Sequence, residues 1–362
     1  MALQCGIIGI TGSGKTSIFN CISNNKASTE SFSNKPNVGV IQVPDNRLYE
    51  LDKLEHSEKI VHATVAIVDI PGLVRGAGNN ESSGNRLLAE IRNTDAILHV
   101  VRCFDDPTIP HPDITVNPVR DIENIELELQ ARDLESVEKK IGRLEKNLKA
   151  GDKDAKRGIE VMQIYKEHLE SFKPARTIEL PEHDKRQADD VYLLSAKKVI
   201  YVANVDSASA VNGNAFSKAM TEYLSEQNAE VLIIAGKLES EIAELESDDD
   251  RKMFLEDAGL LEPGVNKLVR AAYESLNLLT FFTVGVKEIR AWTIRKGMTA
   301  PNAAGVIHSD LERGFIRAEV MKYIDYTTLK TEHACKEKGK LFVEGKNYIV
   351  EDGDILNIRF NV

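Results

Sequence analysis

The first half of the chain alternates short apolar runs, rich in β-branched residues, with stretches of helical period. Apolar strands separated by helical segments are typical of a mostly parallel sheet with helices on both faces. The pattern therefore predicts an α/β domain whose first helix covers residues 15–24. The six strands expected in its sheet cover residues 3–9, 38–43, 64–69, 96–101, 199–204 and 231–235.

Between the fourth and fifth expected strands, charged residues become frequent and apolar residues recur in steps of three and four. This period indicates helices, and Gly151 interrupts it, so we expect a helical hairpin. The hairpin is either a spacer with a solvated surface or a docking arm for a large partner. The first apolar stripe consists of Leu127, Leu134, Val137, Ile141, Leu144 and Leu148, and the second of Met162, Tyr165, Leu169 and Phe172.

The segment 278–362 consists of strand-like runs separated by glycine-containing turns. We expect strands over 280–284 and 291–294, and a hairpin whose turn is Asp352-Gly353. The segment is thus predicted to be a separate β-rich domain. With 13 Lys and Arg against 11 Asp and Glu, it is the only region of the sequence that leans positive.

Composition narrows the class of protein. The 362 residues include 46 Lys and Arg and 57 Asp and Glu, so a net charge of −11 argues against a general nucleic-acid coat. Any RNA contact must come from a local basic surface. The four cysteines form no C-x-x-C pair, which argues against a zinc site and a disulfide framework. No apolar run is long enough for a signal peptide or a membrane span, so we expect a cytoplasmic protein.

Residues 9–16, Gly-Ile-Thr-Gly-Ser-Gly-Lys-Thr, fit the motif G-x-x-x-x-G-K-[ST] between a predicted strand and a predicted helix. In that context backbone N–H groups and the helix N-terminus bind phosphate. We expect Lys15 to reach the β- and γ-phosphates and the Thr16 hydroxyl to bind Mg²⁺. The alternative is a glycine-rich turn without function, which the motif in this context does not favour.

The tetrapeptide Asp69-Ile-Pro-Gly72 follows the third expected strand. An Asp at the carboxyl end of a strand beside a phosphate loop suits a Mg²⁺ contact, usually through water. The backbone N–H of Gly72 can donate to a γ-phosphate. A D-x-x-G tetrapeptide also occurs in ordinary turns, but its position after the phosphate loop favours the functional interpretation.

The base-side sequence favours adenine. Guanine-specific switches use N-K-x-D, whose Asp pairs with two guanine N–H groups, whereas this chain has Asn204-Val205-Asp206-Ser207. An unpaired buried donor costs roughly 1–3 kcal/mol, so guanine loses its main advantage. We therefore predict ATP in preference to GTP.

Beyond these motifs, the most specific longer stretches are residues 36–40, 43–48, 69–77, 95–102, 117–123, 286–294, 300–308 and 352–362. These stretches resemble the Obg-like ATPase family, specifically the YchF subfamily of P-loop NTPases, and the resemblance covers essentially the full length. The resemblance implies a GTPase-like domain (1–120 and 186–277), an inserted coiled-coil hairpin (121–185) and a C-terminal β-grasp-like TGS domain (278–362). It also implies ATP hydrolysis and ribosome association.

The resemblance also implies the site residues. The family's first-switch Thr falls on Ser33, which keeps a hydroxyl for Mg²⁺ beside Thr16 and Asp69. Two positions depart from the family, since Gly12 replaces an Asn and Ser207 replaces a Glu, and the Asn that a monovalent cation would rest on is therefore missing. The residues expected to contact the nucleotide are Gly9, Thr11, Gly12, Ser13, Gly14, Lys15, Thr16, Ser17, Asn204, Val205 and Ala235.

Catalysis has a weak point in this sequence. Related switches orient the attacking water with a Gln after D-x-x-G, and Leu73 stands there instead. We expect slow intrinsic hydrolysis, with Lys15 and Gly72 as catalytic groups. His111, in the loop 105–118, is a further candidate, and the alternative is a loop histidine without a role.

Other notable residues have structural interpretations. His99 lies inside an expected strand and is predicted to be a core histidine. Asp45 and Arg47 are predicted to form a structural ion pair. Trp292 is predicted to lie in a core, with RNA stacking as the alternative.

Two functions remain open from the sequence. The first is an ATPase switch whose ATP and ADP forms differ in ribosome affinity, and the second is a non-catalytic, ATP-dependent RNA-binding adaptor. A small-molecule kinase is not favoured, because neither the hairpin nor the C-terminal domain resembles a kinase lid. The expected partners are the ribosome, including its large subunit, and ribosomal RNA or tRNA through the hairpin and the C-terminal domain. We expect no membrane partner and a monomer.

Overall fold

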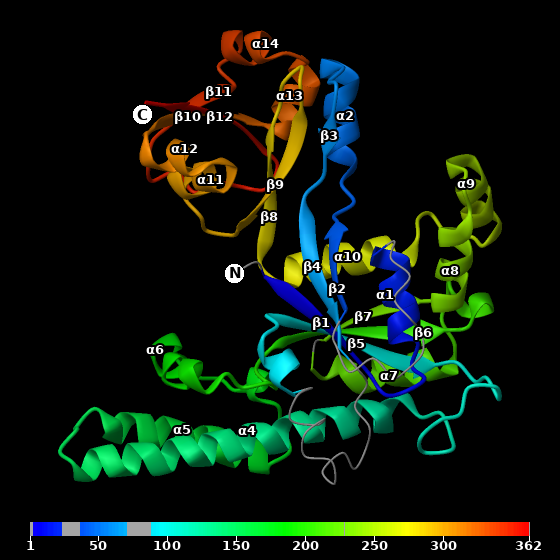
Figure 1. The fold of residues 1–362 in the computed structure, drawn as a ribbon, viewed down its shortest axis with the longest axis vertical. Coiled ribbons are helices and arrows are strands. Elements are labelled where there is room, and N and C mark those ends of the chain that lie inside the picture. The colour runs from blue at the N-terminus through cyan, green and yellow to red at the C-terminus, as the bar shows by residue number, and fades with distance from the viewer. Residues whose placement is uncertain (1–2, 24–36, 71–87, 228, 362) are drawn as a thin grey trace. The chain divides into compact units, whose positions relative to one another are not determined.

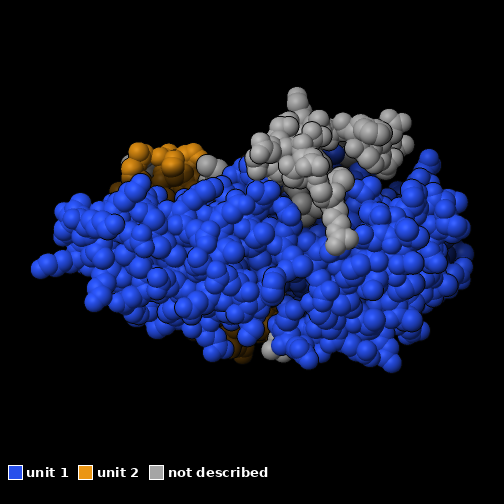
Figure 2. Space-filling view, turned by 90° about the horizontal axis from the view of Figure 1, so that it is seen from below, with its two compact units in different colours: residues 1–39, 66–268 blue, residues 40–65, 269–362 orange. Residues whose placement is uncertain are grey.

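The chain divides into two compact units, which Figure 2 shows in different colours. Unit 1 comprises residues 1–39 and 66–268, and unit 2 comprises residues 40–65 and 269–362. Residues 40–65 thus group with the C-terminal segment, and the three-domain division by residue stays a prediction. The computed structural model describes residues 3–23, 37–70, 88–227 and 229–361.

The described part of the chain contains a six-stranded sheet in the order β2-β4-β1-β5-β6-β7 (Figure 1). β1 pairs in parallel with β4 and β5, and β5-β6 and β6-β7 are also parallel. The α/β class and the mostly parallel sheet are therefore confirmed, with strand ends within two residues of those expected. The strands are β1 (Gln4–Ile8), β2 (Asn37–Gln42), β4 (Thr64–Asp69), β5 (Ala96–Cys103), β6 (Lys198–Val205) and β7 (Glu230–Ile234).

Helices pack on this sheet through apolar side chains. All eight residues of β5 are buried, and Val101, Ile122, Tyr201 and Met220 form one cluster that joins β5, α4, β6 and α7. The helices that the structure describes in unit 1 are α1 (Lys15–Ser23), α4 (Pro118–Lys149), α5 (Ala155–Glu170), α6 (Glu182–Lys185), α7 (Ala215–Ser225), α8 (Gly236–Glu244) and α9 (Asp248–Asp257). A further helix, α10 (Gly264–Ser275), begins in unit 1 and ends in unit 2. Short 3-10 turns cover Ala175–Thr177, Arg186–Val191 and Ser207–Ser209.

The predicted hairpin consists of α4, which is 32 residues long, and α5, which lie side by side (Figure 1). Asn117 begins α4 as an N-cap, because its side chain accepts a hydrogen bond from the backbone N–H of Arg120, and Pro118 occupies the first turn. Apolar side chains of both helices form its core, namely Val137, Val161, Met162, Tyr165 and Leu169, with Leu134, Ile141 and Leu144 at the edge.

Three residues of the two apolar stripes lie outside this core. Leu127 is 42% exposed, Leu148 is 39% exposed and Phe172 is 74% exposed. Leu127 faces away because the first turns of α4 bury Ile125 and Leu129 instead. Leu148 lies at the free end of α4, and Phe172 follows the last turn of α5 with a φ of 57°. The spacing of apolar residues predicted the two helices correctly, but it did not predict which side chains of each helix the other helix covers.

Unit 2 contains a second sheet in the order β11-β10-β12-β8-β9-β3 within the described residues. β10 is antiparallel to β11 and β12, β8 is antiparallel to β9, and β12-β8 is parallel. The strands are β3 (Ile60–Val61), β8 (Leu278–Thr283), β9 (Ile289–Arg295), β10 (Phe315–Lys322), β11 (Leu341–Glu344) and β12 (Asp354–Phe360). The helices are α2 (Asn46–Glu55), α11 (Ala300–Ile307), α12 (Ser309–Arg313), α13 (Tyr323–Leu329) and α14 (Glu332–Glu337).

The hairpin predicted around Asp352-Gly353 is wrong. A turn is present, with a Gly353 φ of 85°, but β12 pairs with β10 and β8. The preceding segment instead follows residues 298–300, since the backbone N–H of Val350 donates to Met298 and Tyr348 accepts from Ala300. A local turn motif does not reveal which distant strand offers the better pairing.

Two structural interpretations are supported in unit 2. Arg47 donates to both carboxylate oxygens of Asp45 and, at 2.6 Å, to Asp352. Trp292 is partly buried, stacks on Phe281 and donates its indole N–H to Thr283. Across the residues that the structure describes, no helix is both long and apolar enough to span a bilayer.

Candidate functional site

The phosphate loop joins β1 to α1, and two of its glycines have backbone conformations that side chains rarely adopt. Gly12 has a φ of 79° and Gly14 a φ of 87°. A Cβ on Gly14 would lie 2.2 Å from Nδ2 of Asn204. The side-chain amide of Asn204 donates to the Ser13 carbonyl at 2.8 Å, and its oxygen accepts from the Gly236 N–H at 2.9 Å. Asn204 thus fastens the phosphate loop to the start of α8.

The proposed Mg²⁺ ligands are adjacent in the structure. The Thr16 hydroxyl donates to Oδ2 of Asp69 at 3.0 Å, although 53 residues separate them. Burial raises the pKa of Asp69, while Lys15, Thr16 and Asn37 counteract this increase. Oδ1 of Asp69 is buried and has no hydrogen-bond partner among the described residues. A hydroxyl beside a carboxylate with a spare oxygen fits Mg²⁺, which prefers oxygen ligands.

Two further groups of the loop, the Ser13 hydroxyl and the Lys15 ammonium, are withdrawn from water. The Ser13 hydroxyl is fully buried and makes no hydrogen bond within the described chain. Burial lowers the pKa of Lys15, and the negative charge of Asp69 partly opposes that effect. Buried polar groups are normally satisfied, so these atoms indicate a place for an anionic ligand.

The predicted base-side residues also meet at the sheet edge. Val205 is buried in the apolar cluster of α4 and α7, which leaves its backbone as the part that could contact a base. Ala235 precedes α8 and is buried. Asp206 does not point to a free position, because its carboxylate accepts from Ser209 and Asn214. These contacts lower the pKa of Asp206 against the effect of burial.

His111 lies in the loop after β5 and is held at both ring nitrogens. Its Nε2 is 3.0 Å from Oδ2 of Asp121, and its Nδ1 accepts from the Asp113 backbone N–H at 3.1 Å. Its side chain is only 2% exposed. In this arrangement the ring orders the loop onto the start of α4 and has no free nitrogen for a water molecule.

Arg102 is a residue that the sequence analysis did not single out. It is 1% exposed, and its guanidinium donates to the carbonyls of Phe104, Asp106 and Ile109. A Cβ on Gly12 would lie 3.5 Å from its Nη1. A charged residue at the carboxyl end of an otherwise apolar strand was the available clue.

Some predicted residues are not part of these contacts. Ser33 and Gly72, with Leu73, lie outside the described residues. Thr11 is exposed, and Ser17 is partly buried on α1. Gly9 is buried, and a Cβ there would lie 2.4 Å from the Val100 carbonyl oxygen.

His99 is a core histidine, as predicted. It is 2% exposed and its ring lies 5.5 Å from that of Tyr201. Burial lowers its pKa to about 4. Tyr201 in turn shares Glu126 with Arg176, which ties the base of the arm to β6.

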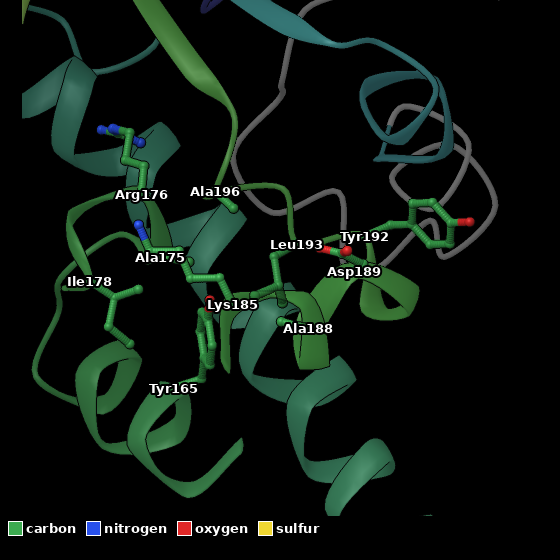
Figure 3. A pocket seen from close by; sticks show the side chains of 10 residues that line it. All are labelled: Tyr165, Ala175, Arg176, Ile178, Lys185, Ala188, Asp189, Tyr192, Leu193 and Ala196. Carbon is green, nitrogen blue, oxygen red and sulfur yellow. The ribbon is translucent and has the colours of Figure 1, made fainter. Parts of the chain in front are cut away.

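A separate pocket of about 320 Å³ lies at the base of the arm (Figure 3). It shares no lining residue with the phosphate loop. Tyr192 extends away from the other lining side chains in Figure 3 and is 64% exposed. The lining residues are Tyr165, Ala175, Arg176, Ile178, Lys185, Ala188, Asp189, Tyr192, Leu193 and Ala196.

Two family models match the chain. Residues 4–144 match a model described as "50S ribosome-binding GTPase". Residues 278–361 match the YchF GTPase C-terminal model, whose description is "Protein of unknown function (DUF933)".

Similar proteins extend over the whole chain. The "Ribosome-binding ATPase YchF" of Bacillus subtilis (strain 168) is 45% identical, and that of Escherichia coli O157:H7 is 42% identical, each with 100% of both chains covered. The solved structure of the Schizosaccharomyces pombe YchF GTPase superposes with a TM-score of 0.87 at 31% identity, covering 99% of this chain and 97% of that one. Together with the phosphate-loop geometry, these matches show that the chain belongs to the YchF family of P-loop NTPases.

Proposed function

We propose that the chain is a slow, Mg²⁺-dependent ATPase that binds ribosomes, and that its nucleotide state sets its ribosome affinity. The observation that supports this most directly is the Thr16–Asp69 hydrogen bond beside Lys15 in a P-loop. Both "Ribosome-binding ATPase" relatives share this chain's full length. A non-catalytic adaptor is the alternative, and measured turnover separates the two.

The residues present suit a nucleoside triphosphate. Lys15 would contact the β- and γ-phosphates, and the loop N–H groups would donate to them. Thr16 would hold Mg²⁺ directly, and Asp69 would hold it through water. When bound, Mg²⁺ neutralises charge on the phosphate oxygens. The expected low intrinsic rate rests on Leu73, which stands where related switches have a water-orienting Gln.

The base-side contacts support ATP in preference to GTP. A guanine-specific site needs a carboxylate free to accept two guanine N–H groups, and Asp206 is already bonded to Ser209 and Asn214. Both ends of the Asn204 amide are also in use. Adenine would therefore be recognised through backbone groups near Val205. Equal affinities for ATP and GTP in a direct titration would contradict this assignment.

His111 stays a candidate for water positioning only if nucleotide binding frees one of its nitrogens. The contacts to Asp121 and Asp113 must then break. If His111→Ala leaves single-turnover hydrolysis unchanged, the ring has only the structural role seen here.

The tip of the helical arm is the part of unit 1 best suited to ribosomal RNA. Along the arm, several cations are paired, as in Lys166–Glu138 and Arg157–Asp184. At the tip, exposed lysines form no ion pair with any described residue. Unpaired lysines are available to replace phosphate counterions. These tip lysines are Lys146, Lys149, Lys153 and Lys156.

Ribosome sedimentation with ATP, with ADP and without nucleotide tests the switch. We expect binding to differ between ATP and ADP, and identical binding in all three conditions would leave the adaptor. Lys149→Ala should weaken binding and reduce the slope of log affinity against log salt by about one. Lys173→Ala, an exposed lysine after the other end of α5, is the matched control and should change neither quantity.

A further inference from the structure

The environment of Arg102 is unusual for a buried charge. The residue is 1% exposed, and its guanidinium lies over the Phe104 ring, 4.7 Å from the centroid. Its hydrogen-bond acceptors are three neutral carbonyls, at 2.9 Å for Ile109 and 3.1 Å for Phe104 and Asp106. Among the described residues no carboxylate forms an ion pair with it. Buried charges are normally paired, because removing a charge from water is costly.

The position of this charge relates it to the phosphate loop. Arg102 is paired in register with Asn204, whose amide holds the Ser13 carbonyl. A Cβ on Gly12 would lie 3.5 Å from Nη1 of Arg102 and 3.2 Å from Cγ2 of Ile109. The guanidinium and residues 104–109, whose carbonyls it holds, therefore lie beside Gly12. Gly12 has no side chain to separate them from the phosphate loop.

No lysine next to Asn204 supplies such a charge. The following residue is Val205, which is apolar and buried. The cation at this edge of the loop comes instead from the neighbouring strand β5. Burial lowers the pKa of Arg102. The negative charges of Asp105, Asp106 and Asp121 oppose this effect only in part.

We propose that Arg102 is a nucleotide-positioning residue, which holds a fixed positive charge against the Gly12 side of the phosphate loop and strengthens nucleotide binding in proportion to the number of phosphates. This inference rests on the proposed function, since it needs a polyphosphate nucleotide as the complementary anion. Arg102 acts on the nucleotide through the phosphate loop and through the electric field of its charge. Its effect on affinity therefore follows the charge of the nucleotide and does not depend on the hydrolysis step.

The test is calorimetric titration of the full chain with Mg²⁺ and ATP, ADP or AMP. Arg102→Met keeps an unbranched side chain and removes the charge. We expect ATP affinity to fall about tenfold, ADP affinity to fall less and AMP affinity to change least. An equal loss for all three nucleotides, or no loss, would overturn the proposal.

Two variants separate charge from loop anchoring. Arg120→Met is the matched control, because Arg120 holds the other end of the same loop through the Thr115 carbonyl and Asp121, and it should leave the ATP-to-ADP ratio unchanged. Arg102→Lys keeps the charge but not the three-carbonyl fork, and it should restore most of that ratio. If Arg102→Met does not fold, Arg102→Lys decides: a native ratio supports the proposal, and a ratio near one overturns it. Failure of the native chain to bind ATP would instead refute the proposed function.

Discussion

The phosphate loop and the base of the helical arm both bury polar groups, but they differ in whether those groups have hydrogen-bond partners. At the arm base, Glu126 accepts two hydrogen bonds from Arg176 and one from Tyr201. At the phosphate loop, the Ser13 hydroxyl and Oδ1 of Asp69 have no partner within the described chain. Burial without a partner costs stability.

This difference indicates where the protein gives up stability for binding. A satisfied network such as that of Glu126 fixes the arm to β6, and its removal should affect folding. We expect a ligand to complete the unsatisfied cluster beside the glycine-rich loop, so removal of that cluster should affect binding. The same kinds of side chain therefore have separable effects, which mutation can test.

The largest expected effect is on hydrolysis. Lys15→Ala should lower the ATPase rate by about 10²- to 10³-fold, because it removes the cation aimed at the transferring phosphate. Steady-state phosphate release measures it. Lys197→Ala is the matched control, since Lys197 is also partly buried but donates to the Arg92 and Thr94 carbonyls. An equal loss of activity in both variants would break the comparison.

The next effect is on folding. Glu126→Ala leaves the Arg176 guanidinium without its carboxylate, and we expect the free energy of unfolding to fall by about 3–5 kcal/mol. Urea denaturation followed by circular dichroism measures it. ATP affinity per folded molecule should stay unchanged. A loss of ATP affinity at constant stability would show that the arm base belongs to the binding site.

A third test uses the pH dependence of stability. Because burial lowers the pKa of His99 from 6.5 to about 4, the folded state binds fewer protons than the unfolded state between these values. Stability should therefore fall as the pH drops from 6.5 to 4, by about 3 kcal/mol for this group. His99→Phe should flatten that part of the curve, and an unaltered slope would contradict a buried neutral histidine.

The smallest expected effect is the change in the free energy of unfolding when Asp69 is replaced. This change has the opposite sign to the one expected for Glu126→Ala. Burial raises the pKa of Asp69, so in the ligand-free protein its charge opposes folding above that pKa, and the opposition disappears as the pH falls through it. Asp69→Asn should thus slightly stabilise the ligand-free chain at neutral pH. It should also weaken Mg²⁺-dependent ATP binding about tenfold. A destabilised variant would place Asp69 with the satisfied residues.

Sequence reasoning was most successful where the determinants are local. The β-branched runs located the six strands of the first sheet, because a strand buried on both faces must be apolar throughout. Residues 9–16 were placed correctly between β1 and α1, since the motif needs a strand, a turn and a helix N-terminus. The strand order of the second sheet was not predictable, because β12 pairs with the distant strands β8 and β10 and not with the segment that directly precedes it in the sequence.

The amino-acid sequence by itself determined the α/β class, the phosphate loop with its glycines, and the absence of a guanine-type N-K-x-D motif. Each of these features depends on residues that are close together in the sequence. The sequence had already placed Thr16 and Asp69 at one Mg²⁺ site, and the tertiary structure added their direct hydrogen bond. Only the tertiary structure decided that Asn204 holds Ser13 and that Arg102 lies beside Gly12. These contacts join residues brought together by strand order and register, which follow from packing the whole core rather than from any local pattern.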